Sequence, residues 1–205
     1  MLTRLLLLAI LTVGAHSHGA GLAGTEAKLV HILAKLQEPG AADPTFRCFH
    51  IGRLQATSEL LTGNLKALQA RPHRTLQDNE LLQRGKQLRF GMAKILQREN
   101  GSCSFVFQEK AGGIPEADLL HEISTHRKKM RGTGAEDPVL KCFHLGRLSI
   151  WTGGLKRMIA KKTRKGEAID RKALHLLDTT DEFVDKESAT SCKPAAQPRT
   201  KSIEA

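Results

Sequence analysis

The sequence predicts an all-α fold, arranged as a tandem repeat of two small disulfide-clamped three-helix units. Three observations lead to this prediction. A twelve-residue segment occurs twice, each copy brings two cysteines, and leucine dominates the apolar residues while tyrosine is absent and Trp151 is the one tryptophan. A leucine-rich, aromatic-poor composition favours packed helices over a β-sandwich.

The repeated segment reads DPTFRCFHIGRL at 43–54 and DPVLKCFHLGRL at 137–148, with an offset of 94 positions and eight identities in twelve. A second match has an offset of 90, TGNLK at 62–66 and TGGLK at 152–156. The offset changes by four residues, about one helical turn, so a continuous helix keeps the same buried face. We therefore expect two tandem units, one at 18–111 and one at 112–192.

The chain begins with the features of a secretory signal peptide, at residues 1–17. A short positive segment at 1–4 precedes an apolar segment at 5–13, and small residues follow. We expect cleavage after Ala15 or Ser17. No second apolar stretch reaches the ~20 residues of a membrane span. The mature protein is therefore predicted to be soluble, secreted and extracellular.

Six helices follow from the apolar periodicity and the turn signals. In order along the chain they are expected at about 26–37, 44–70, from 76 onward, 115–130, 138–162 and 167–185. The second of the three helices in each unit, called the middle helix, is preceded by Asp and begins with Pro. The Asp is an N-cap, and proline suits the first helical position because its missing N–H costs nothing there. Thr75 and Asp78 resemble a capping box with Asp in place of the usual Glu or Gln. The polar, proline-containing tail at 193–205 is expected to be disordered.

Four cysteines allow three disulfide pairings. If each unit can fold alone, Cys48 pairs with Cys103 and Cys142 pairs with Cys192. Each bond would then clamp the open end of a helical hairpin and stabilise a small core by ~2–4 kcal/mol. An even number of cysteines in an exported chain also fits disulfides better than free thiols.

The glycines of the repeated segment, Gly52 and Gly146, fall inside predicted helices. Glycine costs ~1 kcal/mol there relative to alanine. Its presence in both copies indicates the close approach of another backbone or of the disulfide. The cysteine beside it is interpreted as a staple, and the phenylalanine as part of the core.

The repeated histidines, His50 and His144, are expected to be partly exposed near the disulfides. With Arg53 and Arg147 three residues later, each could share a surface patch for an anion. The common Phe-His-Gly-Arg surface is thus a second candidate binding surface. A nucleophilic Cys-His pair is disfavoured, because adjacent residues on a helix point ~100° apart.

No motif predicts an enzyme, a cofactor or a structural metal. The chain contains no phosphate-binding loop, no G-x-S-x-G nucleophile elbow and no Cys-x-x-Cys pair. One conditional metal site remains. Cleavage after Ala15 would leave His16-Ser17-His18 at the amino terminus, where the amine and the His18 imidazole could chelate Cu(II) or Ni(II).

The net charge of +11 would draw an exported protein to polyanions. Two segments, 127–132 and 160–165, each hold four basic residues in six. Together they supply Arg127, Lys128, Lys129, Arg131, Lys161, Lys162, Arg164 and Lys165. Their spacing resembles that of sulfated-glycan-binding segments, although cations at helix C-termini also complement the macrodipole. Specific nucleic-acid binding is not expected, because the chain has few aromatics on which bases could stack.

These features predict a secreted non-enzymatic protein, an extracellular matrix or binding component that contacts sulfated glycans, mineral surfaces or other extracellular molecules. One alternative is a basic membrane-active defence protein or toxin that uses an amphipathic helix at 155–165. Another is a helical signalling ligand. The sequon at Asn100 predicts N-glycosylation.

Overall fold

The computed structural model describes residues 20–99, 103, 113–115, 118–130 and 136–194. These residues form α-helices and one 3-10 turn, with no β-strand among them, which confirms the all-α prediction. The elements are α2 (Ala20–Gln37), η1 (Pro39–Ala42), α3 (Pro44–Gln69), α4 (Leu76–Glu99), α5 (Leu119–Met130), α6 (Pro138–Arg164) and α7 (Arg171–Ser191). Within this part of the chain, no helix is long and apolar enough to cross a membrane.

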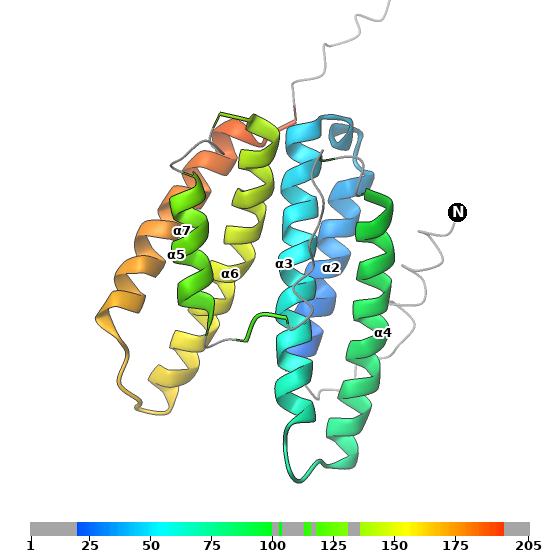
Figure 1. Cartoon of the computed structure of the whole chain (residues 1–205), viewed down its shortest axis with the longest axis vertical. Coiled ribbons are helices and arrows are strands. Elements are labelled where there is room, and N and C mark those ends of the chain that lie inside the picture. The colour runs from blue at the N-terminus through cyan, green and yellow to red at the C-terminus, as the bar shows by residue number, and fades with distance from the viewer. Residues whose placement is uncertain (1–19, 100–102, 104–112, 116–117, 131–135, 195–205) are drawn as a thin grey trace, which may run out of the picture.

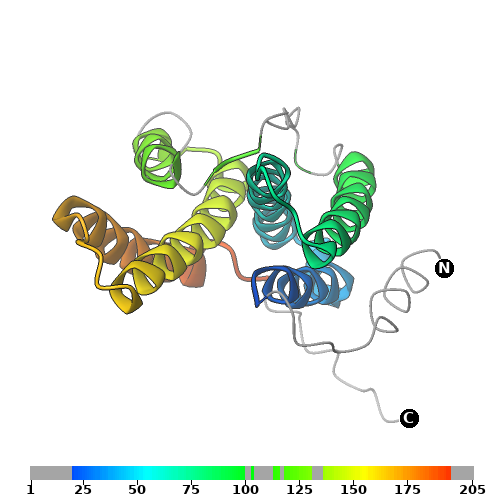
Figure 2. The same cartoon turned by 90° about the horizontal axis from the view of Figure 1, so that it is seen from below.

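The helices form two groups of three, which meet along α3 and α6 (Figure 1). In one group α3 packs against α2 and α4, and in the other α6 packs against α5 and α7. Seen from below, α3 and α6 occupy the centre, with α2 and α5 on opposite sides of them (Figure 2).

Each group has its own hydrophobic cluster, and the two clusters exchange residues across the central interface. Phe143 of α6 belongs to the cluster of the first group. Ala56 and Leu60 of α3 belong to the cluster of the second group, which surrounds the fully buried Trp151. Neither group therefore has a complete core without a residue of the other.

Both middle helices start where the sequence predicts. The Asp43 carboxylate accepts hydrogen bonds from the backbone N–H groups at positions 45 and 46, and Asp137 does the same for positions 139 and 140. The capping box at the start of α4 is confirmed as well. The Thr75 N–H donates to the Asp78 carboxylate over 3.0 Å, and the Asp78 N–H donates to the Thr75 hydroxyl over 3.1 Å.

Four helix ends, in three helices, differ clearly from the prediction. α2 begins six residues earlier, since Leu22 packs against the first cluster. α5 begins at Leu119 instead of 115, after a turn in which the Asp118 N–H donates to the Pro115 carbonyl. α7 spans 171–191 instead of 167–185, because Asp170 caps it by accepting from the residue-172 N–H and because the helix continues up to the disulfide.

The disulfides are the two that the sequence predicts, Cys48–Cys103 and Cys142–Cys192. Their Cα atoms lie 5.7 and 5.6 Å apart. Each bond joins the beginning of a middle helix to the chain that follows the third helix of the same group. The helical hairpins α3–α4 and α6–α7 are therefore closed at their open ends.

Residues 113–115, a described part of the connection between the groups, lie against α3. The Ile114 N–H donates to the Glu59 carbonyl over 3.0 Å. A Cβ on Gly63 would lie 2.4 Å from the Ile114 carbonyl oxygen, so only glycine permits this contact. Gly63 of the TGNLK segment thus allows residues 113–115 to lie directly against α3.

Candidate functional site

The two repeated segments touch each other, and each glycine lies against the backbone of the other helix. A Cβ on Gly52 would lie 2.1 Å from the Phe143 carbonyl oxygen, and one on Gly146 would lie 2.0 Å from the Phe49 carbonyl oxygen. Any side chain at either position would force α3 and α6 apart. The expected close approach is confirmed, and what approaches each glycine is another backbone, not the disulfide.

Helix packing hides much of the surface that the Phe-His-Gly-Arg residues were expected to offer to a partner. His50 is 4% exposed, Phe143 is 5% exposed and Arg147 is 9% exposed. The expectation that His50 is partly exposed is therefore wrong, whereas His144 is half-buried. The physical reason differs along the segment. Phe143 packs into the first hydrophobic cluster and Arg147 pairs with Glu59 of α3, so the crossing covers these two residues. His50 lies near the charges of His31 and Lys35, so α2 helps to bury it.

A buried ion pair lies at the same interface. Arg147 Nη2 donates to both carboxylate oxygens of Glu59 over 2.9 Å, and the Gln55 amide donates to one of them over 3.1 Å. Glu59 is fully buried, and the Arg147 guanidinium carbon lies 4.7 Å from the Trp151 ring centroid. Buried charges persist only when they are paired and hydrogen-bonded. Sequence reasoning missed this pair, although Glu59 is the one charged residue in the stretch 54–63.

Three histidines near this interface are neutral at physiological pH. Burial, followed by nearby cationic groups, lowers the pKa of His50 and of His126 to about 3, and that of His144 to about 4. His126 Nδ1 lies 3.1 Å from the Glu122 carbonyl oxygen, so Nδ1 carries the proton. The His126 ring meets the Trp151 ring edge-on at 4.5 Å. The three imidazole rings therefore pack in the interior as neutral groups.

The described residues do not assemble a metal centre, since no three or more His, Cys, Asp or Glu side chains among them are placed to hold an ion. All four cysteines are in disulfides, so none offers a thiol nucleophile. The conditional copper or nickel site at residues 16–18 lies outside the described residues.

The basic cluster at the end of α6 is open to solvent. Lys161, Arg164 and Lys165 are exposed, and Lys162 is half-buried. A carboxylate from Glu167 lies 3.6 Å from the Lys165 amine. Four cations therefore lie at this end of α6, and the one ion pair described for them is that of Lys165 with Glu167.

The cluster at the end of α5 differs. Arg127 donates to the Thr179 hydroxyl over 2.7 Å and to the Thr180 hydroxyl over 3.3 Å, so its guanidinium helps to hold α5 against α7. Lys128 and Lys129 are exposed, and Arg131 lies outside the described residues.

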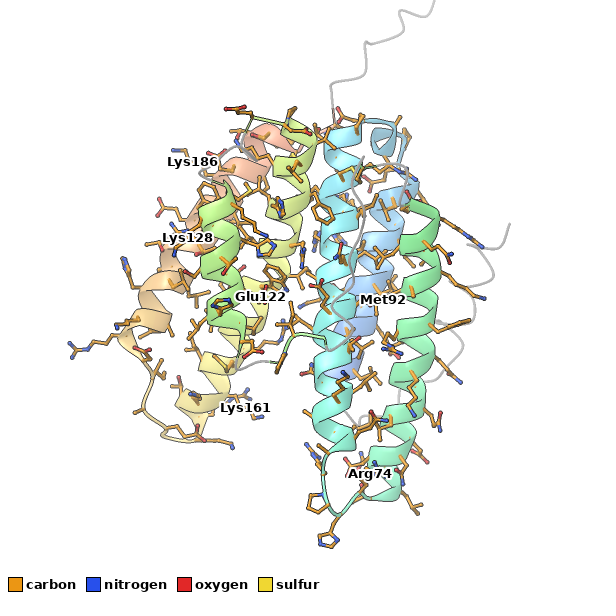
Figure 3. All side chains as sticks on the ribbon, viewed as in Figure 1. Arg74, Met92, Glu122, Lys128, Lys161 and Lys186 are labelled. Carbon is orange, nitrogen blue, oxygen red and sulfur yellow. A yellow bond between two sulfur atoms is a disulfide. The ribbon has the colours of Figure 1, made fainter. Side chains whose placement is uncertain are left out.

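The two clusters do not form one surface. Because α5 and α6 run in opposite directions, their C-terminal ends lie at opposite ends of the group. Figure 3 shows Lys128 toward one end of the molecule and Lys161 toward the other. The seven described residues of the predicted basic set are therefore divided into two separate patches.

A groove lies beside the α6 cluster, with a volume of about 520 Å³ and Lys161 on its lining. Its apolar wall includes Leu22 and Leu68, and its polar wall includes Thr25 and Arg71. The Arg71 guanidinium forms an ion pair with Asp78 over 3.3 Å. The groove extends the α6 patch toward α2 and α3.

The predicted signal peptide at 1–17, the sequon at Asn100 and most of the tail at 193–205 lie outside the described residues and stay predictions. Comparisons with protein-family models, with curated proteins and with solved structures found no match to this chain.

Proposed function

We propose that the chain is a secreted non-enzymatic protein that binds extracellular polyanions, such as sulfated glycans or mineral surfaces. In this proposal its scaffold is a tandem repeat of two disulfide-clamped three-helix units. The predicted signal peptide and the two disulfides support an extracellular location.

The duplication is supported by correspondences at one fixed offset. Adding 94 to positions 43, 48 and 52 gives 137, 142 and 146. The first pair are the N-caps of the middle helices, the second pair are disulfide cysteines, and the third pair are the glycines of the crossing. Three separate structural roles recurring at one spacing favour two copies of one ancestral unit.

The exposed cations at the end of α6 carry the functional proposal. Lys161, Lys162, Arg164 and Lys165 lie within five residues on one helix end, and Glu167 approaches only Lys165. A polyanion can contact several of these cations at once and release its counterions. The α5 cluster is the weaker candidate, because Arg127 is engaged by α7.

The membrane-active alternative requires the apolar side of residues 155–165 to reach a lipid surface. Leu155 is fully buried, while Met158 and Ile159 are partly buried against the second hydrophobic cluster. Exposing them would break the contact of α6 with its own group. If the folded protein caused anionic vesicles to leak, the membrane-active alternative would be preferred over polyanion binding.

The test is the salt concentration that elutes the whole mature protein from an immobilised sulfated glycan. The cluster variant carries Lys161→Ala, Lys162→Ala, Arg164→Ala and Lys165→Ala. We expect it to elute at clearly lower salt than the unmodified protein, because fewer counterions are released on binding.

The control carries Lys86→Ala, Arg89→Ala, Lys94→Ala and Arg98→Ala, four exposed cations of α4. Both variants lower the net charge by four, so only the position of the charge differs. The control should stay close to the unmodified protein. Equal elution of the two variants would mean that total charge governs retention, and the α6 patch would then be rejected as a site.

A further inference from the structure

Arg53 and Arg147 occupy matching positions on α3 and α6, at the offset of 94. The guanidinium carbon of Arg53 lies 5.9 Å from the Phe49 ring centroid, and that of Arg147 lies 5.9 Å from the Phe143 ring centroid. The two arginines thus leave their helices in the same way. What surrounds their charged ends is different.

Arg147 is neutralised by Glu59, which lies seven residues after Gly52, the crossing glycine of α3. Seven residues after Gly146, the crossing glycine of α6, the chain has Gly153. Gly153 offers no carboxylate. Within the described part of the chain, no ion pair involves Arg53, and its buried Nε has no hydrogen-bond partner. Among the described residues, the partly buried Arg53 guanidinium therefore lacks the carboxylate that pairs with Arg147.

Lys28 lies near the charges of both Arg53 and Arg157. Burial, then the charges of Arg157 and Arg53, lowers the pKa of Lys28 to about 8, so each guanidinium is close enough to the Lys28 amine to disfavour its charge. Arg157 Nη1 lies 3.7 Å from the position of a Cβ on Gly153. The cations come from three helices, with Lys28 on α2, Arg53 on α3 and Arg157 on α6.

We propose that Lys28, Arg53 and Arg157 form a binding site for one tetrahedral oxyanion, sulfate or phosphate, beside Gly153. The anion would neutralise Arg53 as the Glu59 carboxylate neutralises Arg147. Guanidinium groups suit this role because their planar fork donates two parallel hydrogen bonds to an oxyanion. The site shares no residue with the basic cluster at the end of α6, so it can be tested independently of the proposed polyanion binding.

The test compares the midpoint of thermal unfolding of the mature, disulfide-bonded protein in sulfate and in chloride at equal ionic strength. A ligand that binds only the folded state raises this midpoint. Sulfate also stabilises proteins generally by exclusion from their surface. The site-specific part is therefore the rise beyond that of a variant without the site.

Three variants isolate that part. Gly153→Glu supplies the missing carboxylate, so it should raise the midpoint in chloride and lose the site-specific rise in sulfate. Gly153→Ala separates the effect of helix propensity and should keep the rise. Arg157→Gln changes an exposed residue, so it should fold and lose the rise even if Gly153→Glu does not fold.

Lys86→Gln, at an exposed position on α4, is the control for charge and should respond as the unmodified protein does. Equal responses of Arg157→Gln and Lys86→Gln would overturn the proposal. An unmodified protein with no greater response than Arg157→Gln would overturn it too. The cluster variant of the column experiment should keep the sulfate response, which separates failure of one proposal from failure of the other.

Three anions identify the source of the oxyanion: inorganic sulfate, inorganic phosphate and a sulfated disaccharide at matched ionic strength. If the disaccharide acts at tenfold or more lower concentration than the inorganic salts, the site takes a sulfate ester carried by a glycan. If the inorganic anions act as well, the site takes a free anion. Either result supports the site, provided that Arg157→Gln abolishes the response.

Discussion

A fully buried carboxylate, Glu59, is the residue on which the electrostatics of the α3–α6 interface depend. It lies 88 positions from Arg147, its cationic partner. Local rules therefore could not predict the pair. The N-caps Asp43 and Asp137 could be predicted, because a cap and the N–H groups that it binds lie within three residues.

Glu59→Gln should lower the free energy of unfolding by about 3–5 kcal/mol, because it leaves the Arg147 guanidinium buried without its counter-charge. Glu26→Gln, which breaks the more exposed pair with Arg84, should cost at most about 1 kcal/mol. Urea unfolding of both variants gives the comparison. If the two variants lose the same stability, the buried pair does not have the role assigned to it.

The buried histidines predict a loss of stability in mild acid. Their pKa values fall from 6.5 to about 3 or 4 on folding, so the unfolded chain binds more protons between these values. Stability is then complete above about pH 6.5 and falls as the pH is lowered. Between pH 7.5 and 5.5 the loss should reach up to about 1 kcal/mol for each histidine.

Urea midpoints at the two pH values measure this loss. His126→Gln should reduce the difference between the midpoints, whereas His175→Gln, at an exposed position on α7, should not. The interpretation fails if both variants keep the full difference.

At the scale of elements, the sequence predicts the helices and their partners well but the helix ends less well. Asp-Pro signals place the starts of α3 and α6 correctly, since both depend on neighbouring residues. The start of α2 depends on Leu22 packing against a distant cluster. The end of α7 is followed by Cys192, whose disulfide partner Cys142 lies 50 positions away in sequence. Tertiary contacts of this kind leave no local signal.

The disulfides should contribute equally to the two groups. Their sequence separations of 55 and 50 residues are similar, so the loop-closure entropy that each removes from the unfolded chain is also similar. Replacing either pair by serines should lower the free energy of unfolding by roughly 2–4 kcal/mol. Guanidinium unfolding of the two double variants measures both costs, and a cost near zero for either would show that its hairpin does not need the clamp.

At the scale of the whole molecule, the two groups of helices form one structure through the repeated segment. Phe143 completes the core of the first group, and Ala56 and Leu60 contribute to the core of the second. Binding experiments should therefore use the complete mature chain, because either group alone would expose apolar surface and unpaired buried charge. The sequence predicts a duplication and a tight contact at the glycines, but not that the two repeated segments make this contact with each other.

We infer that the repeated segment encodes the crossing of α3 and α6, and alanine substitutions at two glycines of α6 test this role. Gly146→Ala and Gly153→Ala gain the same helix propensity, up to ~1 kcal/mol. A Cβ at Gly146 meets the Phe49 carbonyl oxygen at 2.0 Å, whereas the nearest atom to a Cβ at Gly153 is 3.7 Å away.

The measurement is the free energy of unfolding of these two variants in urea. We predict that Gly153→Ala is at least as stable as the unmodified protein. Gly146→Ala should lower the free energy of unfolding by about 1–3 kcal/mol, a typical cost of overpacking. Equal changes in the two variants would show that the repeated glycine has no role in bringing the helices together.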